Sequence, residues 1–443
     1  MYMLFALLTF ALMVLCFTLL HSSAFASDKT RVIATTDGEI DDRCSMIRFL
    51  MYANEWDIKG LIHSSSKHHW KGDAEHPGKR WQDVSWLDRQ IDKYAEVYPN
   101  LKKHDSDYPS PEYLREQVFV GNIILEGDMR EETPGSNRIA EMLLDDDPSP
   151  VWLQAWGGGN TIARALKSIQ EKHPDRMAYV SKKALIYLIA EQDNTHEVYI
   201  MKEWPDVQII LSYAFVSIAY RWYNFMDDEQ QKYFDAKWMR ENILENHGPL
   251  CAMYEAHDDG RFRSEGDSPS YMHEIGVGLR SIEHPTYGGW GGRFKRAGSM
   301  WRDAEDDGSR EKTILRWAIA FQNDWAARAD WCVKSYEEAN HPPVVKLAHG
   351  LDLKAKVGQT VQLSAKGTTD PDGDEISYRW WQYREPGSYS GTVNISSADQ
   401  QEASFVVPDN ANSGDTIHII CEVTDNGTPP LTRYKRVIVE VFS

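Results

Sequence analysis

RVIATTDGEIDD, residues 31–42, decides the fold, because an apolar run ends directly in a cluster of acidic residues. Residues 31–36 are typical of a buried strand, and the apolar spacing of residues 45–56 is typical of a helix. Asp37, Asp41 and Asp42 therefore lie where a strand ends and a helix begins. In open α/β sheets, ligands bind at the carboxyl ends of the strands. The stretch predicts an α/β sheet with a ligand site at this edge.

The same alternation of strands and helices continues to about residue 340. Further strand-like runs are IKGLIH (58–63), VWLQAW (151–156), ALIYLIA (184–190) and DVQIILS (206–212). Helical spacing of apolar residues recurs at 160–172 and 313–331. Short buried strands that alternate with helices predict a mostly parallel sheet with flanking helices. We expect one α/β domain over residues 27–342.

A change of pattern follows His341-Pro342-Pro343. No helical run occurs beyond it, and turns rich in Gly, Asp and Pro separate six strand-like runs: 344–350, 360–367, 377–385, 403–409, 416–427 and 436–443. About 100 residues of this kind predict an antiparallel all-β sandwich of immunoglobulin-like (Ig-like) architecture. We expect this second domain over residues 343–443. Within it, Trp380 and Trp381 point to opposite faces of their strand, so one is expected in the core and the other is available to carbohydrate.

The chain start predicts export. Residues 1–26 contain no charged residue, and their apolar run ends in Ala24-Phe25-Ala26, whose small residues fit a signal-peptidase site. We expect a signal peptide over 1–26, with an uncleaved membrane anchor as the alternative. No second apolar run of spanning length occurs. The expected mature protein is secreted or periplasmic, without stable membrane insertion.

Composition excludes one class of partner and allows one class of metal. The 443 residues carry 48 Lys and Arg against 67 Asp and Glu, a net charge of −19. Such acidity repels phosphate, so no nucleic-acid partner is expected. It permits calcium, which prefers oxygen ligands. Sixteen tryptophans are available as core residues or as flat faces for stacking on sugar rings.

Four cysteines follow the predicted signal peptide: Cys44, Cys251, Cys332 and Cys421. They form neither a CxxC pair nor a zinc-type spacing with histidine. Buried free thiols are expected, with a Cys251–Cys332 bridge as the alternative in an oxidising compartment.

The acidic cluster has two explanations. Three neighbouring carboxylates repel one another and raise their pKa values unless a cation lies between them. Ligation by oxygen alone favours calcium or magnesium over zinc. The alternative is capping of the following helix, for which a single Asp would be enough. Three Asp together with Glu39 favour a metal or substrate site.

Three motifs, in this order along the chain, carry a resemblance to a known family. Residues 36–42 (TDGEIDD) resemble the nucleoside hydrolase signature that follows the first strand, and residues 153–163 (LQAWGGGNTIA) resemble that superfamily's third-strand motif. Residues 265–270 (EGDSPS) with 284–293 (HPTYGGWGGR) are similar to a family of exported bacterial cellulose-binding proteins. That family joins a nucleoside hydrolase-like domain to a C-terminal β-sandwich, and the resemblance spans nearly the whole mature chain.

The resemblance implies a role for each matching residue. Asp37 matches a calcium ligand that also acts as general base, and Asp42 matches a bidentate calcium ligand. Asp41 matches a contact to sugar hydroxyls. The carbonyl of Trp156 and the carboxylate of Asp267 match the remaining calcium (Ca2+) ligands.

The resemblance also has gaps. Thr35 stands where nucleoside hydrolases carry another aspartate, and Gly38-Glu39 replaces Pro-Gly. The family's residues for the ribose 5′-hydroxyl have no clear match, although Asp193-Asn194 and Glu197 lie in the corresponding region. These gaps disfavour a free nucleoside as substrate.

Four further residues are candidates for substrate contact. His69 and Trp70 follow the second strand and are expected at the pocket rim, and Asn160 belongs to the third-strand motif. Trp290 lies in a Gly-rich aromatic loop with His284. Such a loop suits stacking on a sugar face or inward packing of its aromatic residues.

Two functions are consistent with this sequence. One is a calcium-dependent hydrolase of a glycosidic or N-glycosidic bond, acting on a plant or algal glycan. The other is a non-catalytic protein that keeps the hydrolase fold and binds cellulose or another polysaccharide. The sequence leaves the oligomeric state open.

Overall fold

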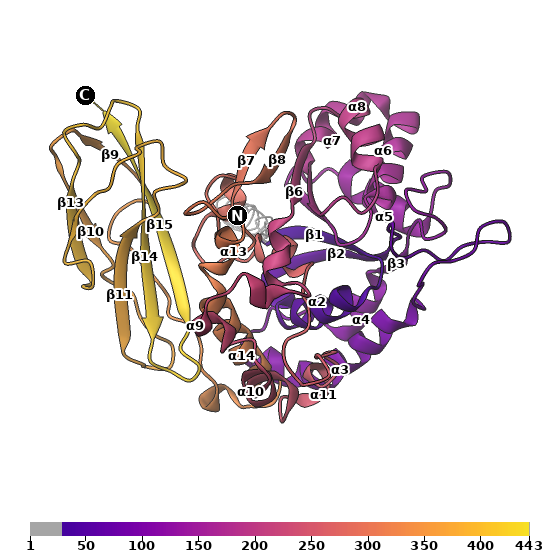
Figure 1. The fold of residues 1–443 in the computed structure, drawn as a ribbon, viewed down its shortest axis with the longest axis horizontal. Helices are drawn as coiled ribbons and strands as arrows, with labels where there is room; N and C mark the ends of the chain where they lie inside the picture. The colour runs from indigo at the N-terminus through magenta and orange to yellow at the C-terminus, as the bar shows by residue number, and fades with distance from the viewer. Residues whose placement is uncertain (1–28, 443) are drawn as a thin grey trace, which may run out of the picture.

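The computed structural model describes residues 29–442, which form an α/β domain and a β-sandwich beside it (Figure 1). The predicted signal peptide, residues 1–26, lies outside the described residues. Within the described part of the chain, no helix is both long and apolar enough to cross a membrane.

An eight-stranded sheet forms the centre of the α/β domain, in the order β3-β2-β1-β4-β5-β6-β8-β7. Neighbouring strands are parallel except for the antiparallel β7–β8 pair. The strands are β1 (Thr30–Thr36), β2 (Trp56–His63), β3 (Val118–Val120), β4 (Val151–Ala155), β5 (Ala184–Ile189), β6 (Gln208–Ser212), β7 (Phe294–Ala297) and β8 (Met300–Asp303). The predicted mostly parallel sheet is confirmed.

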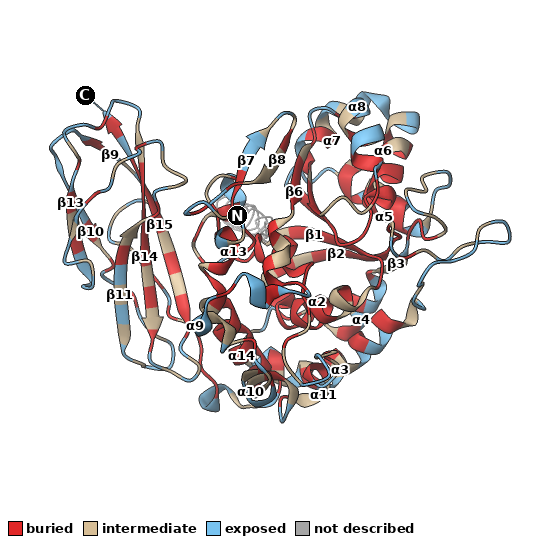
Figure 2. Cartoon of the chain, viewed as in Figure 1, coloured by how far each residue is buried: buried red, intermediate tan, exposed pale blue. Residues whose placement is uncertain are grey.

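Helices cover both faces of this sheet. They are α2 (Ile40–Met51), α3 (Ser85–His104), α4 (Pro111–Glu116), α5 (Pro134–Leu144), α6 (Asn160–Lys172), α7 (Met177–Lys183), α8 (Met201–Glu203), α9 (Asp228–Gln231), α10 (Ala236–Met239), α11 (Gly248–Cys251), α12 (Ser268–Met272), α13 (Lys312–Leu315) and α14 (Ala318–Trp331). Val32 of β1 packs into the core with α2, α3 and α14, whereas the adjacent Ile33 packs into the core with α5 and α6. Because both faces are covered, β1 is buried along nearly its whole length (Figure 2).

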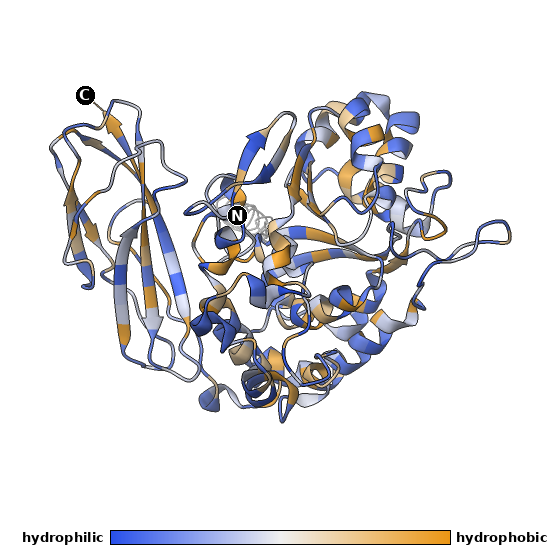
Figure 3. Cartoon of the chain, in the orientation of Figure 1, coloured by the Kyte–Doolittle hydropathy of each residue, from blue (hydrophilic) through white to orange (hydrophobic). Residues whose placement is uncertain are grey.

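Two predicted helices differ in their limits. The helix expected at 45–56 is α2, which begins at Ile40 and thus takes Asp41 and Asp42 into its first turn. The helix expected at 313–331 is divided into α13 and α14. The helix expected at 160–172 matches α6, whose apolar side is buried and whose other side is polar (Figure 3).

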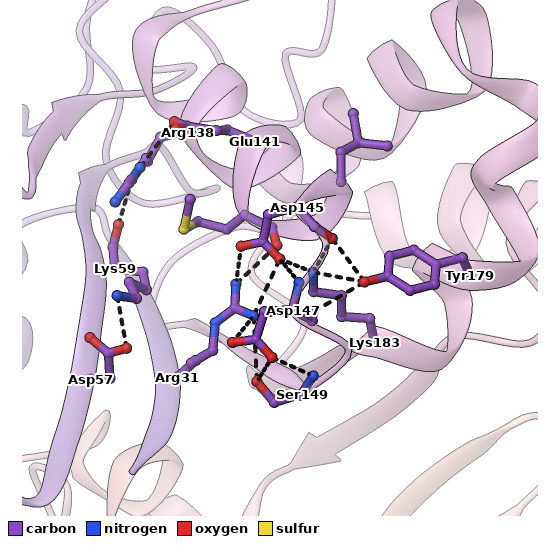
Figure 4. Close-up of polar contacts among 12 residues, drawn as sticks. Arg31, Asp57, Lys59, Arg138, Glu141, Asp145, Asp147, Ser149, Tyr179 and Lys183 are labelled. Atoms are coloured by element: carbon purple, nitrogen blue, oxygen red, sulfur yellow. Dashed lines mark hydrogen bonds and ion pairs between the residues drawn. The ribbon is translucent and has the colours of Figure 1, made fainter. Parts of the chain in front are cut away.

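Charged residues at the amino-terminal edge of the sheet pair with one another (Figure 4). Arg31, at the start of β1, forms an ion pair of 2.6 Å with Asp145, and Lys183 also pairs with Asp145. Asp147 lies 3.1 Å from Arg31. Each buried cation at this edge therefore has a carboxylate partner, which offsets the cost of its burial.

The C-terminal sandwich has a three-stranded sheet, β10-β13-β12, and a four-stranded sheet, β11-β14-β15-β9. The strands are β9 (Asp352–Lys356), β10 (Thr360–Ser364), β11 (Ile376–Gln382), β12 (Ile395–Ser396), β13 (Glu402–Val406), β14 (Thr416–Asp425) and β15 (Thr432–Phe442). Two expectations are corrected. The run 344–350 forms no strand beyond a single bridge at Val344, and β15 pairs with β9 in parallel.

Strand β15 contacts the α/β domain. Arg436 is fully buried, and its guanidinium donates to the carbonyls of Leu279 (2.7 Å), Tyr287 (2.7 Å) and Gly288 (3.0 Å). Arg433 donates to Asp324 of α14 at 2.6 Å. These buried contacts hold the two domains against each other.

The cysteines expected after the signal peptide are buried. No disulfide links Cys44, Cys251, Cys332 and Cys421, all of which lie among the described residues. Burial and the neighbouring Cys332 thiol raise the pKa of Cys251 well above its ordinary value.

Candidate active site

The loops that follow the parallel strands meet at the carboxyl edge of the sheet. Asp37 follows β1 and Trp156 follows β4, and these two strands are neighbours although β2 and β3 come between them in the chain. Their connections run to opposite sides of the sheet, which makes this place the topological switch point where α/β sheets bind ligands. The position predicted from residues 31–42 is therefore occupied by a converging set of polar loops.

Two groups of acidic side chains lie at this point. Oxygens of Asp41, Asp42 and Asp267 lie within 4.8 Å of one another, and so do ligand atoms of Asp37, Glu39 and His69. Asp267 directly precedes α12. The start of α12 therefore brings the Asp267 carboxylate to the first turn of α2. The structure thus brings together the four aspartates predicted from the sequence.

Backbone and hydroxyl donors orient two of these carboxylates. Asp42 accepts hydrogen bonds from the hydroxyl of Thr36 (2.5 Å) and the backbone N–H of Asp37 (3.1 Å). Asp37 accepts from the backbone N–H of Glu39 at 3.2 Å. The helix-capping explanation is not supported for Glu39 at the N-cap, whose side chain caps no N–H of α2.

Glycine is required behind the cluster. Gly38 has φ = +77°, and an added Cβ there would lie 2.9 Å from the indole nitrogen of Trp86. A Cβ on Gly157 would lie 2.9 Å from the Cβ of Asp37. The loop after β4 can approach Asp37 this closely because residue 157 has no side chain.

The electrostatics of the cluster are unfavourable without a cation. Burial and repulsion by neighbouring carboxylates raise the pKa of Asp42 and of Asp267 well above the ordinary value. Burial, with repulsion by Glu39 and Asp37, raises the pKa of Asp41 to about 7. Among the described residues, no lysine or arginine forms an ion pair with these three carboxylates. This edge therefore contrasts with the paired charges at the amino-terminal edge.

The donor set fits a hard divalent cation such as calcium. One carboxylate oxygen of Asp37 and one of Asp267 are buried without a hydrogen-bond partner. Unpartnered buried anionic oxygens are costly, and calcium takes six to eight oxygen ligands, often from carboxylates and backbone carbonyls. The carbonyl of Trp156, predicted as a further ligand, accepts a hydrogen bond from the side-chain amide of Gln192. That contact leaves the carbonyl one remaining lone pair for a cation.

His69 lies beside the proposed base. Its Nδ1 is 3.6 Å from Asp37 and 3.7 Å from Glu39. Burial would raise the pKa of Asp37, but the His69 imidazole holds it below the ordinary value. Burial would lower the pKa of His69, but Asp37 and Glu39 raise it. A cavity of about 400 Å³ borders His69 and Glu39 and also contacts Trp81.

Two predicted substrate contacts are engaged in other interactions. The side chain of Asn160 is fully buried; it accepts from Ser64 (2.8 Å) and donates to Ser65 (3.0 Å) and to two backbone carbonyls. It therefore ties loops together rather than facing a ligand. Trp70 donates its indole N–H to the carbonyl of Pro77, and Lys79 lies 4.7 Å from the ring centroid.

Trp290 also lies away from the site surface. Its side chain is 1% exposed and packs near Phe321 in the core. The Gly-rich loop around it contacts the sandwich instead, since the carbonyls of Tyr287 and Gly288 accept from Arg436. Inward packing therefore applies to Trp290, whereas Tyr287 is half-buried and His284 is exposed.

Two further polar residues, Tyr220 and Asp193, lie at the site or beside it. The hydroxyl of Tyr220 lies 3.1 Å from Asp41 and 3.2 Å from Glu39. Tyr220 comes eight residues after β6, and no local pattern marks it. Asp193 follows β5 and has a buried oxygen without a partner, and a Cβ on Gly158 would lie only 2.3 Å from that oxygen. Because Asp193 comes shortly after a predicted strand, its sequence position could have indicated that it lies at the ligand-binding edge of the sheet.

Comparison with known proteins identifies the family. The model for the nucleoside hydrolase-like domain of the cellulose-binding protein Sde182 matches residues 31–294, more than half of the chain. The chain belongs to this family. A second model, for the C-terminal domain of the cellulose-binding protein Sde0182, matches residues 360–441. Curated proteins give no match.

Solved structures agree with this assignment. The Sde182-family chain is 33% identical to a nucleoside hydrolase-related hypothetical protein from Saccharophagus degradans that is associated with carbohydrate metabolism. The alignment covers 93% of this chain and 100% of that chain, with a TM-score of 0.78.

More distant structures score low. The type III effector XopQ complexed with adenosine diphosphate ribose is 10% identical over 69% of this Sde182-family chain and 94% of that chain, with a TM-score of 0.31. A PKD domain from the KIAA 1837 protein is 20% identical over 23% of this chain and 90% of that chain, with a TM-score of 0.17. Similarity this low carries no argument about the site.

Proposed function

We propose that this protein is exported and is a calcium-dependent hydrolase that acts on a glycosidic or N-glycosidic bond of a carbohydrate. The observation that carries the proposal is the buried set of Asp37, Asp41, Asp42 and Asp267. One oxygen of Asp37 and one of Asp267 have no hydrogen-bond partner, and among the described residues no lysine or arginine pairs with Asp41, Asp42 or Asp267. A structural protein gains nothing from such repulsion, whereas a metal site requires it.

The acidic residues have different proposed roles in metal binding and catalysis. Asp42, Asp267, Asp37 and the carbonyl of Trp156 would hold the cation. When bound, calcium supplies Lewis acidity toward a water molecule and toward sugar hydroxyls. The unpartnered oxygen of Asp37 accepts a proton from the attacking water, and the low pKa of Asp37 keeps this carboxylate ionised. The surrounding carboxylates stabilise positive charge that develops on the sugar ring as the bond breaks.

His69 orients Asp37. A histidine with a raised pKa, 3.6 Å from the base, holds the carboxylate in place and keeps it negatively charged. Asp41 remains for sugar hydroxyls, and the Tyr220 hydroxyl donates to it at 3.1 Å.

A glycan is favoured over a free nucleoside as the substrate. The family is named for cellulose binding, and its solved relative is associated with carbohydrate metabolism. Export, proposed from residues 1–26, would place the protein in the periplasm or outside the cell, where polysaccharides are encountered.

A binding protein without turnover is the second candidate. Thr35 is buried and donates its hydroxyl to the carbonyl of Gln154, so it adds no carboxylate where nucleoside hydrolases carry one. Asn160 is likewise committed to protein contacts. These two observations favour retention of the fold and metal site without catalysis.

A substrate screen separates the two candidates. Purified full-length mature protein is incubated with nucleosides and with plant-type oligosaccharides, once with calcium and once with EDTA. We expect release of base or reducing sugar that depends on calcium. Binding to insoluble cellulose without any product would instead support the second candidate.

Calcium is expected to stabilise the protein more at pH 7.5 than at pH 5. The pKa of Asp41 in the folded protein, about 7, lies above the ordinary value of 3.8. Without metal, the contribution of Asp41 to folding stability is therefore fully present below pH 4 and is lost as the pH rises through 7. In EDTA, this cluster should therefore lower the melting temperature between pH 5 and 7.5. Calcium should reverse the trend, because protons no longer compete for the ligands. Differential scanning calorimetry measures both trends.

Asp42→Asn is the matched control. The amide oxygen can still accept from Thr36, but the negative charge is removed. We expect this variant to melt higher than the wild type in EDTA and to lose the calcium-dependent increase. Equal calcium stabilisation in both proteins would contradict the metal site.

A further inference from the structure

A second concave site lies between the two domains. Its volume is about 600 Å³, and its lining includes Arg316 and Trp317 of the α/β domain and Arg379, Trp381 and Glu422 of the sandwich. It is separate from the carboxylate cluster, which contributes none of these residues.

Aromatic side chains form one wall of this interdomain cleft. Both Trp380 and Trp381 border the cleft, but Trp380 is 2% exposed and belongs to the sandwich core, while the adjacent Trp381 is half-buried. The ring centroids of Trp381 and Trp317, which both line the cleft, are 5.9 Å apart. An aromatic wall of this kind suits an apolar ring face.

Trp317 contributes its ring rather than a polar group to the cleft. Its side chain is 2% exposed, and its indole nitrogen is closed to solvent. The indole of Trp381 donates to Glu422 at 3.1 Å. Hydrogen bonds to a ligand in the cleft would therefore come from the charged side chains that line it.

The charges around the cleft balance. Three arginines and three carboxylates line it. They also face one another, since Arg379 lies 3.6 Å from Glu422 and Arg316 lies 3.9 Å from Glu385. Such a lining offers both donors and acceptors to hydroxyl groups, but no net field for a polyanion. It therefore favours a neutral polyhydroxylated ligand.

We propose that this interdomain cleft binds a single chain of a neutral glucan, with a sugar ring against Trp381. The proposal rests on the carbohydrate association proposed above and adds the location of the binding site. Because the cleft is concave and its tryptophan half-buried, it fits one chain rather than the flat face of crystalline cellulose. The domain junction thus holds the polysaccharide, while the carboxylate cluster lies elsewhere on the α/β domain.

Isothermal titration calorimetry with cellohexaose tests the cleft in the full mature chain. We expect the wild type to bind, and Trp381→Ala and Arg379→Ala each to weaken binding at least tenfold. Arg379 is 69% exposed, so its replacement should leave the fold intact if Trp381→Ala unfolds the sandwich. Trp301→Ala, at a half-buried tryptophan outside the cleft, is the matched control and should bind like the wild type.

The outcomes separate the two proposals. Wild-type affinity in a folded Trp381→Ala or Arg379→Ala protein overturns the cleft but leaves carbohydrate binding in place. If the wild type binds neither cellohexaose nor insoluble cellulose, both the proposed carbohydrate function and the cleft are overturned. An equal loss in Trp301→Ala would show a general effect of tryptophan removal and would also overturn the cleft.

Discussion

Replacing Asp37 with asparagine is expected to lower kcat/KM for the hydrolysed substrate by roughly three orders of magnitude. A positioned general base typically contributes 10²- to 10⁴-fold, and an amide cannot accept the proton. Asparagine at position 37 has nearly the same shape as aspartate, and its side-chain oxygen can still accept a hydrogen bond from the backbone N–H of Glu39. The loss should therefore come from chemistry rather than from misfolding, and steady-state kinetics with calcium measures it.

Two controls separate the base from the metal ligand. Because Asp37 is also a proposed calcium ligand, the assay is repeated over a calcium titration to saturation. The acidic limb of the pH–rate profile should disappear in Asp37→Asn if this carboxylate is the base. Asp57→Asn, at the amino-terminal end of β2, should keep wild-type kinetics. Unchanged kcat/KM in Asp37→Asn would remove Asp37 from the mechanism.

Arg436→Met is expected to lower the free energy of unfolding by about 3 kcal/mol or more. The side chain has 0% exposure and donates to three carbonyls of the α/β domain. Methionine fills a similar volume but leaves those carbonyls buried and unpaired, at about 1–3 kcal/mol each. Burial lowers the pKa of Arg436 to about 10, so the guanidinium is still charged at neutral pH.

Calorimetry and a neighbouring variant test this interdomain contact. We expect Arg436→Met to melt several degrees lower and the two domains to unfold in separate transitions, because their coupling is weakened. Lys435→Met changes the adjacent residue, whose side chain points to the other face of β15. This control should melt close to the wild type. An Arg436→Met protein with an unchanged melting temperature would show that the buried guanidinium does not join the domains.

Local sequence was enough for the framework of the site. β1 ends in acidic residues, so the strand-to-helix junction could be located from residues 31–42 alone, and the parallel sheet placed that junction at a ligand-binding edge. The change to an all-β pattern after residue 342 likewise predicted the sandwich. These features depend on residue periods of 2 and 3.6, which a sequence displays directly.

Contacts between distant segments could not be obtained from such periods. Spacing alone does not bring Asp267 to Asp42, and only the family resemblance pointed to it. Trp290 shows the same limit. The Gly-rich aromatic loop was consistent with sugar stacking or inward packing, and the structure buries Trp290 in the core while Arg436 of the sandwich donates to two carbonyls of the loop. Tyr220 has no local mark at all, since its position depends on the path of a long loop after β6.

The sequence by itself determined the order of strands and helices, the acidic edge of the sheet and the division of the chain into two domains. The tertiary structure decided which side chains face the site, which are buried elsewhere and how the interdomain cleft is formed by Trp317 and Trp381. The physical reason is that periodicity reports the face on which a residue lies. Only packing determines which residue from another segment meets that face.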